Sequence, residues 1–284
     1  MTRVSIITPS LNQGRFIGET LQSVKDQDYP GIEHIVIDGG STDGTIDTLR
    51  RYEGVYNLAW TSEPDGGQAH AINKGFRKAG GDVLAYLDSD DLYLPGTVSM
   101  VVGFLDAHRD VDCVYGDIVH IDESGGRLNT VKSIPFQFET LLYGGSLIAE
   151  PSFFFRRRVL EEAGYLDESL SYQMDYEFFL RAASRKMKFA NIPAVLALFR
   201  LHPGSKTMAA KKVFFKDDVM IKSRYRRAPL PLGEKADRCW LGALKKAYRL
   251  KAFLIRAATR GQFMPFATRM AKAGIGGGRA WEVR

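Results

Sequence analysis

Short apolar stretches recur along the first part of the chain and alternate with segments of helical periodicity. The apolar stretches occupy residues 3–10, 31–40, 56–65, 81–91 and 111–122. They are rich in β-branched residues and most end in Gly, Pro, Asp or Ser, which predicts strands that stop at turns. Two helical stripes lie between them, formed by Phe16, Thr20, Leu21 and Val24 and by Ala69, Ile72, Asn73 and Phe76. This alternation predicts a parallel sheet joined by crossover helices.

Three carboxylates follow one of the predicted strands. The run VLAYL at residues 83–87 is apolar without alternation, which is typical of a strand covered on both faces, and Asp88, Asp90 and Asp91 come after it. Like charges beside buried chain cost stability unless a cation or hydrogen-bond donors face them. Ligand crevices in open α/β sheets lie outside the carboxyl ends of the strands. One site is therefore expected from the polar strand ends at residues 8–12, 38–41, 63–68 and 88–91.

The Asp-x-Asp spacing has two interpretations. It suits a hard divalent cation, because Mg²⁺ is usually held by one or two carboxylates together with substrate phosphates. By spacing alone, a solvated turn in which Asp91 caps a helix is favoured. The position at a strand end shifts the balance toward a cation site.

Charge is distributed unevenly along the 284 residues, whose net charge is +6. Up to Ser205 the chain has 19 Lys and Arg against 28 Asp and Glu, a net charge of −9; beyond it the counts are 20 and 5, a net charge of +15. The basic tail is a candidate for contact with anionic lipid, nucleic acid or the acidic first part of the chain. A solvated or internally paired face explains it equally well.

Composition sets the broad class of the protein. A hydrophobic content of 45% and a charged content of 25% indicate a folded chain with room for one large α/β domain and an appendage. Cys113 and Cys239 lack metal-ligand spacing, so neither a disulfide framework nor a zinc ribbon is expected. The N-terminus lacks the apolar stretch of a secretory signal, and no segment reaches the roughly 18 apolar residues of a membrane span. We therefore expect a cytoplasmic protein.

Three stretches carry a family resemblance, and they occur in order along the chain. They are VSIITPSLNQGRFIGETLQSVKDQDYPGIEHIVIDGGSTDGT, NKGFRKAGGDVLAYLDSDDLYLPGTV and MDYEFFLR. Over residues 3–205 the chain resembles the inverting family 2 glycosyltransferases, which have the GT-A nucleotide-diphospho-sugar transferase fold. The resemblance implies an α/β domain in residues 1–205, with a Rossmann-like, mostly parallel sheet flanked by helices. Residues 206–284 then form a basic helical C-terminal extension.

The resemblance implies a donor site at the strand ends. Residues that match the family's donor loops are Thr8, Pro9 and Asn12, which line the nucleotide, and Asp65, Gly67 and Asn73, near the ribose and sugar. The family's second strand ends in Asp-Asp-Gly-Ser, whereas this chain has Gly39 in place of the second aspartate. Asp38 is therefore implied as the base contact, and the identity of the nucleotide stays open.

The same resemblance implies a metal site for Mg²⁺ or Mn²⁺. Asp88 is placed near the ribose and the metal, Ser89 near the donor, and Asp90 on the metal that bridges the diphosphate. The segment LFRLHPGSKT resembles the family's closing Arg-x-His segment, in which His202 approaches the metal or the diphosphate. Read alone, a histidine beside Pro-Gly fits a turn just as well.

The resemblance also implies a catalytic base. The family opens one helix with a Glu-Asp pair, and this chain has Met174 and Asp175 there. Asp175 is implied as the base, although by itself it fits a helix N-cap. Met174 removes a possible acceptor contact, which leaves the acceptor open.

The resemblance, together with these residues, implies a metal-dependent inverting glycosyltransferase. It would move a sugar from a nucleotide-diphospho-sugar, with a UDP-sugar favoured over a dTDP- or GDP-sugar, to a hydroxyl of a glycan or lipid-linked acceptor in polysaccharide or glycolipid synthesis. The alternative is a sugar-nucleotide-binding protein without turnover. A nicotinamide-dependent oxidoreductase is disfavoured because no Gly-x-Gly-x-x-Gly follows the first strand. A nucleic-acid partner is not expected, because it would leave the carboxylates unexplained.

The basic tail adds a localisation hypothesis. Basic helices can hold an enzyme at an anionic membrane surface, where a lipid-linked acceptor is presented. The tail therefore predicts a peripheral position at the inner face of the membrane. Packing of its apolar stripe, which includes Trp240, Leu244, Ala247, Tyr248, Leu254 and Ile255, against the first domain is the competing interpretation.

Overall fold

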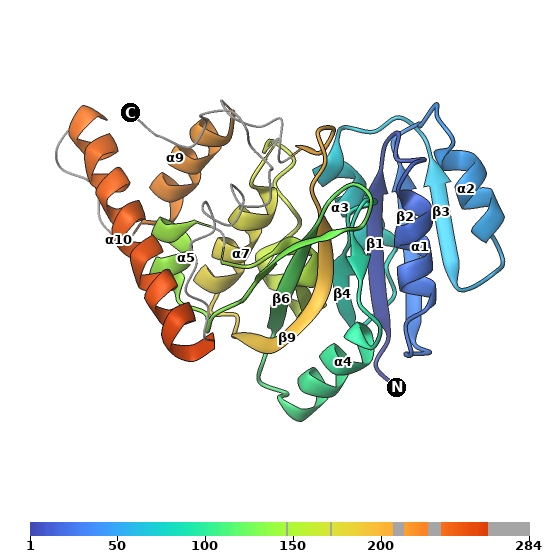
Figure 1. The fold of residues 1–284 in the computed structure, drawn as a ribbon, viewed down its shortest axis with the longest axis horizontal. Helices are drawn as coiled ribbons and strands as arrows, with labels where there is room; N and C mark the ends of the chain where they lie inside the picture. The colour runs from blue at the N-terminus through green and yellow to red at the C-terminus, as the bar shows by residue number, and fades with distance from the viewer. Residues whose placement is uncertain (146, 171, 207–212, 227–233, 261–284) are drawn as a thin grey trace.

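The computed structural model describes residues 1–145, 147–170, 172–206, 213–226 and 234–260. Its first part builds a parallel sheet with crossover helices, as predicted (Figure 1). The elements in chain order are β1 (Val4–Ser10), α1 (Ile17–Lys25), β2 (Ile32–Asp38), α2 (Thr45–Tyr52), β3 (Leu58–Ser62), α3 (Gln68–Lys78) and β4 (Val83–Tyr86). The strands lie in the order β3-β2-β1-β4, and all three neighbouring pairs are parallel.

The second part extends the same sheet with strands of both directions. Its elements are β5 (Leu92–Tyr93), α4 (Thr97–Ala107), β6 (Cys113–Ile121), β7 (Arg127–Val131), α5 (Phe138–Gly144), the 3₁₀ helix η1 (Glu150–Ser152), β8 (Phe154–Arg156), α6 (Arg158–Ala163), α7 (Met174–Ser184) and β9 (Phe189–Arg200). From β4 the order continues β8-β6-β9-β5, and β7 pairs with β6. Only β6 and β9 are parallel in this part, so the predicted parallel arrangement describes the first part of the sheet.

Alternation along the strands determines what each face of the sheet covers. In β4, Leu84 and Tyr86 belong to the core beneath α3 and α7, whereas Val83 and Ala85 belong to the core beneath α4. Successive side chains of a strand point to opposite faces, so an unbroken apolar run is what a strand covered on both sides needs. The two cores together hold the carboxyl end of β4, and Asp88 beyond it, in a fixed place.

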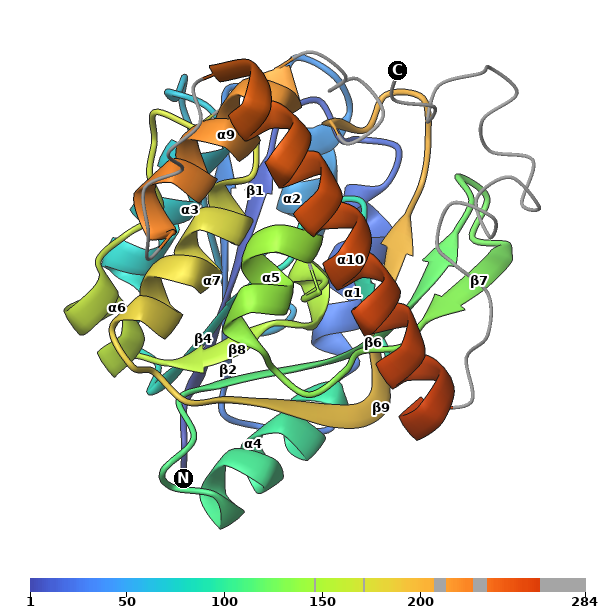
Figure 2. The same ribbon diagram turned by 90° about the vertical axis from the view of Figure 1, so that its left-hand side faces the viewer.

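The described part of the extension consists of α9 (Val213–Tyr225) and α10 (Glu234–Arg260), at the end of the molecule opposite α2 (Figure 1). Figure 2 shows α10 lying across α5. Ile221 and Ala252 enter the main core, but Leu254 is 55% exposed, so the predicted apolar stripe packs only in part. The side chain of Trp240 and residues 261–284 lie outside the described residues. Among the described helices, none combines the length and apolar content of a membrane span.

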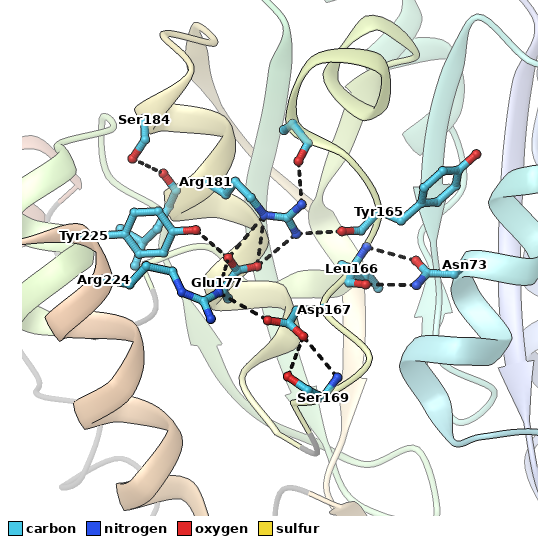
Figure 3. A network of polar contacts seen from close by, with 12 residues as sticks. Asn73, Tyr165, Leu166, Asp167, Ser169, Glu177, Arg181, Ser184, Arg224 and Tyr225 are labelled. Carbon is cyan, nitrogen blue, oxygen red and sulfur yellow. Dashed lines mark hydrogen bonds and ion pairs between the residues drawn. The ribbon is translucent and has the colours of Figure 1, made fainter.

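A buried carboxylate ties α9 to α7 (Figure 3). Glu177 is fully buried and accepts hydrogen bonds from Arg181 of its own helix and from Arg224 and Tyr225 of α9. The Arg224 Nη1 atom also lies 3.2 Å from Asp167 Oδ2. A buried charge is tolerated only when it is paired and hydrogen-bonded. The ionic cluster therefore fixes the extension to the helix that carries Asp175.

Candidate active site

Asp88 lies just beyond β4 and is held by one neutral partner. The Gln68 Nε2 amide, at the start of α3, donates to both Asp88 carboxylate oxygens at 2.7 and 2.9 Å. Burial and then the negative charge of Asp90 raise the pKa of Asp88, and the Gln68 hydrogen bonds lower it, which together leave the pKa at about 7. The positive charge of Lys206 also lowers this pKa, but it does not offset burial and the neighbouring carboxylates.

Asp90 is oriented by a histidine from the far end of the chain. The His202 Nε2 atom lies 2.9 Å from Asp90 Oδ2, and the histidine ring centroid lies 4.7 Å from that of Phe16. Both side chains are mostly buried. The predicted neighbourhood of Asp90 and His202 is present in the structure, with the histidine bonded to the carboxylate.

Asp91 does not cap a helix, so that interpretation is wrong. Strand β5 begins at the next residue, and the following helix starts only at Thr97. Asp91 is 1% exposed, and its Oδ1 accepts a hydrogen bond from the Arg200 backbone N–H at 2.8 Å. Burial and the charge of Asp90 raise the pKa of Asp91. The residue therefore fastens the carboxylate loop to the end of β9.

Asp175 is the second residue of α7 and belongs to the same charged cluster. Burial raises its pKa, while backbone N–H groups at the start of the helix lower it. The charge of Asp175 contributes to the raised pKa of Asp88, so the structure brings the predicted base and the Asp-x-Asp motif together. Met174 is 6% exposed and packs in the core, so it presents no polar group to a ligand.

Three further residues join the cluster that the sequence did not single out. Glu150 of η1 is buried, and burial together with the charges of Asp88 and Asp91 raises its pKa. Lys206 Nζ donates to Gln68 Oε1 at 3.0 Å and lies 5.2 Å from the ring centroid of Tyr172. Burial lowers the pKa of Lys206. Gln68 could have been found from its place at a helix start after Gly-Gly, whereas nothing in the spacing indicates Glu150 or Lys206.

Several residues that were predicted to contact the sugar donor have side chains that point into the protein. Asp38 is fully buried, and its oxygens accept hydrogen bonds from the backbone N–H groups of Gly40 and Ser41 and from the hydroxyls of Ser41 and Ser62. These hydrogen bonds already occupy both carboxylate oxygens, so Asp38 shapes the loop after β2. Its contact with the base stays a prediction.

Thr8 and Asn73 are likewise engaged in the interior. The Thr8 hydroxyl is buried 2.9 Å from His34 Nε2, and Asn73 exchanges hydrogen bonds with the backbone of Leu166 at 2.9 Å (Figure 3). Asn73 also donates to Glu168 at 2.7 Å. These side chains stabilise the walls of the site, and contact of Thr8 with the nucleotide and of Asn73 with the sugar stays a prediction.

The remaining predicted donor residues lie at the same edge of the sheet. Pro9 and Ser89 are buried within their segments, and Asn12 bridges two loops by accepting from the Thr42 N–H at 2.9 Å. Asp65 is half-buried, and its Oδ1 accepts from the Gly67 N–H at 2.7 Å. Gly67 has φ 105°, a left-handed conformation that favours glycine. Contacts of these residues with a donor stay predictions.

The side chains at this site suit a divalent cation that a bound ligand also coordinates. Carboxylate oxygens are the ligands that Mg²⁺ and Mn²⁺ prefer, and Asp88 and Asp90 supply them two positions apart. In the described part of the chain, no three His, Cys, Asp or Glu side chains form a complete metal cage. The residues present therefore fit a cation that takes part of its coordination from a diphosphate.

Comparison with known proteins identifies the family. Residues 5–164 match the family model for glycosyl transferase family 2, so the chain belongs to this family. An uncharacterized glycosyltransferase of Mycobacterium tuberculosis is 36% identical over 182 residues, which are 63% of this chain and 68% of that protein. A putative teichuronic acid biosynthesis glycosyltransferase of Bacillus subtilis, TuaG, is 44% identical over 91 residues, 31% of this chain and 36% of TuaG.

Solved structures confirm the predicted GT-A fold. Staphylococcus aureus TarS 1–349 in complex with UDP-GlcNAc superposes with a TM-score of 0.68 at 20% identity, over 95% of this chain and 79% of that one. The mannosyltransferase PcManGT of Pyrobaculum calidifontis, in complex with GDP-Man and Mn²⁺, gives a TM-score of 0.61 at 22% identity, covering 96% and 79%. The chain spans 46% of the longer TarS structure.

Proposed function

We propose that this glycosyltransferase is a metal-dependent inverting enzyme that uses a nucleotide-diphospho-sugar, with a UDP-sugar favoured and a dTDP- or GDP-sugar as the other choices. The carrying observation is the cluster of Asp88, Asp90, Glu150 and Asp175 at the carboxyl end of β4, a partly buried group of four carboxyl groups near the ammonium group of Lys206. Such a cluster gains stability when a cation binds. TarS and PcManGT, which were solved with UDP-GlcNAc and with GDP-Man and Mn²⁺, support this choice of ligands.

Each residue of the cluster has a role in the proposed reaction. Asp88 and Asp90 would hold Mg²⁺ or Mn²⁺, which when bound supplies positive charge beside the donor diphosphate. His202, bonded to Asp90, orients that carboxylate. Asp175 accepts the proton of the acceptor hydroxyl while the new sugar–oxygen bond forms and the bond to the diphosphate breaks, which inverts the anomeric centre. Lys206 places an ammonium group near Asp88 and Asp175.

Titration of donors into the purified protein tests the proposal. UDP-, dTDP- and GDP-sugars are added with and without Mn²⁺, and thermal stability is followed, since a ligand that binds only the folded state raises it. We expect a metal-dependent stabilisation by one nucleotide class that is lost in Asp90→Ala, together with sugar transfer. Donor binding without transfer or hydrolysis would instead identify a sugar-nucleotide-binding protein, and no stabilisation by any donor would contradict both.

The outer face of α10 supports the proposal that the acceptor, a glycan or a lipid-linked molecule, is presented at a membrane. Leu250 and Leu254 are 58% and 55% exposed and lie one turn apart, with the exposed side chains of Lys246 and Lys251 near them in the helix. Apolar and basic side chains on one helix are typical of contact with anionic lipid. We expect salt-sensitive binding to phosphatidylglycerol vesicles but not to phosphatidylcholine vesicles.

A pair of double variants checks this surface. Leu250→Ser/Leu254→Ser should weaken vesicle binding, whereas Val219→Ser/Met220→Ser, which changes exposed apolar residues of α9, should not. Equal binding by all three proteins, or no binding at all, would contradict membrane recruitment through α10.

A further inference from the structure

One carboxylate at the β2–β3 edge of the sheet keeps a free oxygen. Asp38 is saturated by its own loop, and Asp43 accepts from Thr45 and Gly14 through both oxygens. Asp65, after β3, uses Oδ1 to accept from the Gly67 N–H at 2.7 Å. Within the described residues, Asp65 Oδ2 has no hydrogen-bond partner. Among the carboxylate oxygens of Asp38, Asp43 and Asp65, Asp65 Oδ2 is therefore the one that remains available to a ligand.

Asp65 Oδ2 can occupy its position because Gly39 has no side chain. A Cβ atom built on Gly39 would lie 2.9 Å from Asp65 Oδ2 and 3.2 Å from Asp65 Cγ, closer than such contacts normally occur. Asp65 thus occupies the space into which a residue at position 39 would project. The carboxylate is also fixed in direction, because Gly67 holds its other oxygen.

The position of Asp65 fits the nucleoside end of the proposed donor. The strand order is β3-β2-β1-β4, so Gly39 and Asp65 lie two and three strands from Asp88. With neighbouring strands about 4.8 Å apart, this is roughly 10 to 14 Å along the sheet edge. A donor whose diphosphate lies beside Asp88 extends its nucleoside over that span. Leu11, on the loop between them and 55% exposed, offers an apolar surface to a flat base.

Resting on the proposed function, we propose that Asp65 reads the nucleobase of the donor by accepting a hydrogen bond from an imide N–H, the group that uracil and thymine present. An ionised carboxylate only accepts hydrogen bonds. Cytosine has an unprotonated ring nitrogen at the corresponding position. The lone pair of that nitrogen would face the carboxylate oxygen of Asp65 and be repelled by it. Guanine presents two adjacent donors, but one oxygen of Asp65 is already committed to Gly67. The arrangement therefore selects a uracil or thymine nucleotide.

The Asp65→Asn variant provides the sharpest test. Because the Gly67 N–H must still meet an oxygen, the asparagine carbonyl stays on that side and its NH₂ group faces the base. Affinities of UDP, CDP and GDP for the whole protein with Mn²⁺ are measured by calorimetry. We expect the wild type to bind UDP at least about tenfold more tightly than CDP or GDP, and the UDP-to-CDP preference to fall at least about tenfold in Asp65→Asn.

A second variant tests the same proposal independently of Asp65→Asn. Gly39→Ala places a methyl group against Asp65 Oδ2 and should weaken UDP binding, whereas Gly103→Ala, where nothing lies within 4 Å of the added Cβ, should not. If the ratio of UDP affinity to CDP affinity is unchanged in Asp65→Asn, the proposal that Asp65 reads the base is overturned. This includes the case in which both affinities fall equally, which is the result expected of a contact with the ribose. A wild type that binds none of the nucleotides, nor any nucleotide-sugar, contradicts the proposed function itself.

Discussion

The loops after β2 and β4 each follow a buried parallel strand with an aspartate, yet the two aspartates are in opposite electrostatic states. Asp38 accepts four hydrogen bonds from its own loop and from Ser62. Among the described residues Asp88 accepts hydrogen bonds from the neutral Gln68 amide alone, and the charge of Lys206 does not offset the carboxylates around it. A saturated carboxylate stabilises the protein, whereas an undercompensated one stores a cost that a bound cation can recover.

The same contrast separates the two acids of α7, of which Glu177 is fully buried and Asp175 is half-buried. Glu177 is surrounded by Arg181, Arg224 and Tyr225. Asp175, half a turn earlier in the helix, has Lys206 nearby and adds its charge to those of Asp88 and Glu150. One helix thus carries a structural carboxylate on one side and the proposed catalytic base at its start. The contrast predicts that substitutions of the first kind cost stability and those of the second kind cost function.

Asp175→Asn should give the largest effect. Removing a positioned base costs on the order of 100- to 10,000-fold in rate, so we expect the transfer rate to fall within that range while donor affinity stays the same. Steady-state kinetics and donor titration measure the two quantities. A variant with near-normal transfer would remove Asp175 from its assigned role and break the contrast within α7.

The pH dependence of the wild type offers an independent check on Asp175. The base acts only when deprotonated, and burial raises its pKa above the ordinary value. At saturating Mn²⁺ and donor, where the bound cation would keep Asp88 ionised, the acidic limb of the transfer rate should therefore lie at higher pH than the ordinary aspartate value of about 3.9. That limb should be absent from any residual activity of Asp175→Asn.

Glu177→Gln should give the next largest effect, on stability. The change removes the charge that balances Arg181 and Arg224 in a buried place, and breaking a buried pair costs about 3 kcal/mol. Urea denaturation measures the free energy of unfolding. Arg50→Ala serves as the control, because its partner Asp47 is 70% exposed and the pair should contribute nothing measurable. Equal results for the two variants would contradict the structural role of Glu177.

Periodicity was enough to predict the first part of the fold. The strand and helix stripes that include Leu21, Val24, Ile72 and Phe76 are buried as predicted, because a local repeat determines which face is covered. The antiparallel pairing of β8 with β4 and β6 rests on contacts between residues far apart in sequence. No local pattern encodes those contacts, so the mixed second part of the sheet was not predicted.

The candidate site was predictable in place but not in detail. Asp38 and Asp88 look alike in sequence, because each is an aspartate after an apolar run. Their difference comes from partners such as Ser62 and Gln68, which the fold brings from other strand ends. The same holds for Lys206, which reaches the cluster from beyond β9. Sequence locates the polar strand ends, and tertiary contacts decide which of them are free to bind.

Asp38→Asn should lower the free energy of unfolding by about 2 kcal/mol, the scale of hydrogen bonds to a charged group. The amide would turn an NH₂ group toward donors, because both carboxylate oxygens now accept. Urea denaturation checks the value. Asp26→Asn, on the exposed end of α1, is the matched control and should change stability little. Stability equal to the wild type would show that the Asp38 bonds are not decisive.

Asp88→Asn should have the smallest effect and the opposite sign. Replacing the charge relieves the cost of burial and the repulsion from Asp90, so the free protein should become more stable by about 1 kcal/mol. The isosteric amide keeps a partner in Gln68, which can rotate its own amide to match. The gain should disappear when Mn²⁺ and a nucleotide-sugar are added, because only the wild type is then stabilised. A loss of stability in the free Asp88→Asn protein would place Asp88 with Asp38 among the structural carboxylates, and the contrast between the two loops would fail.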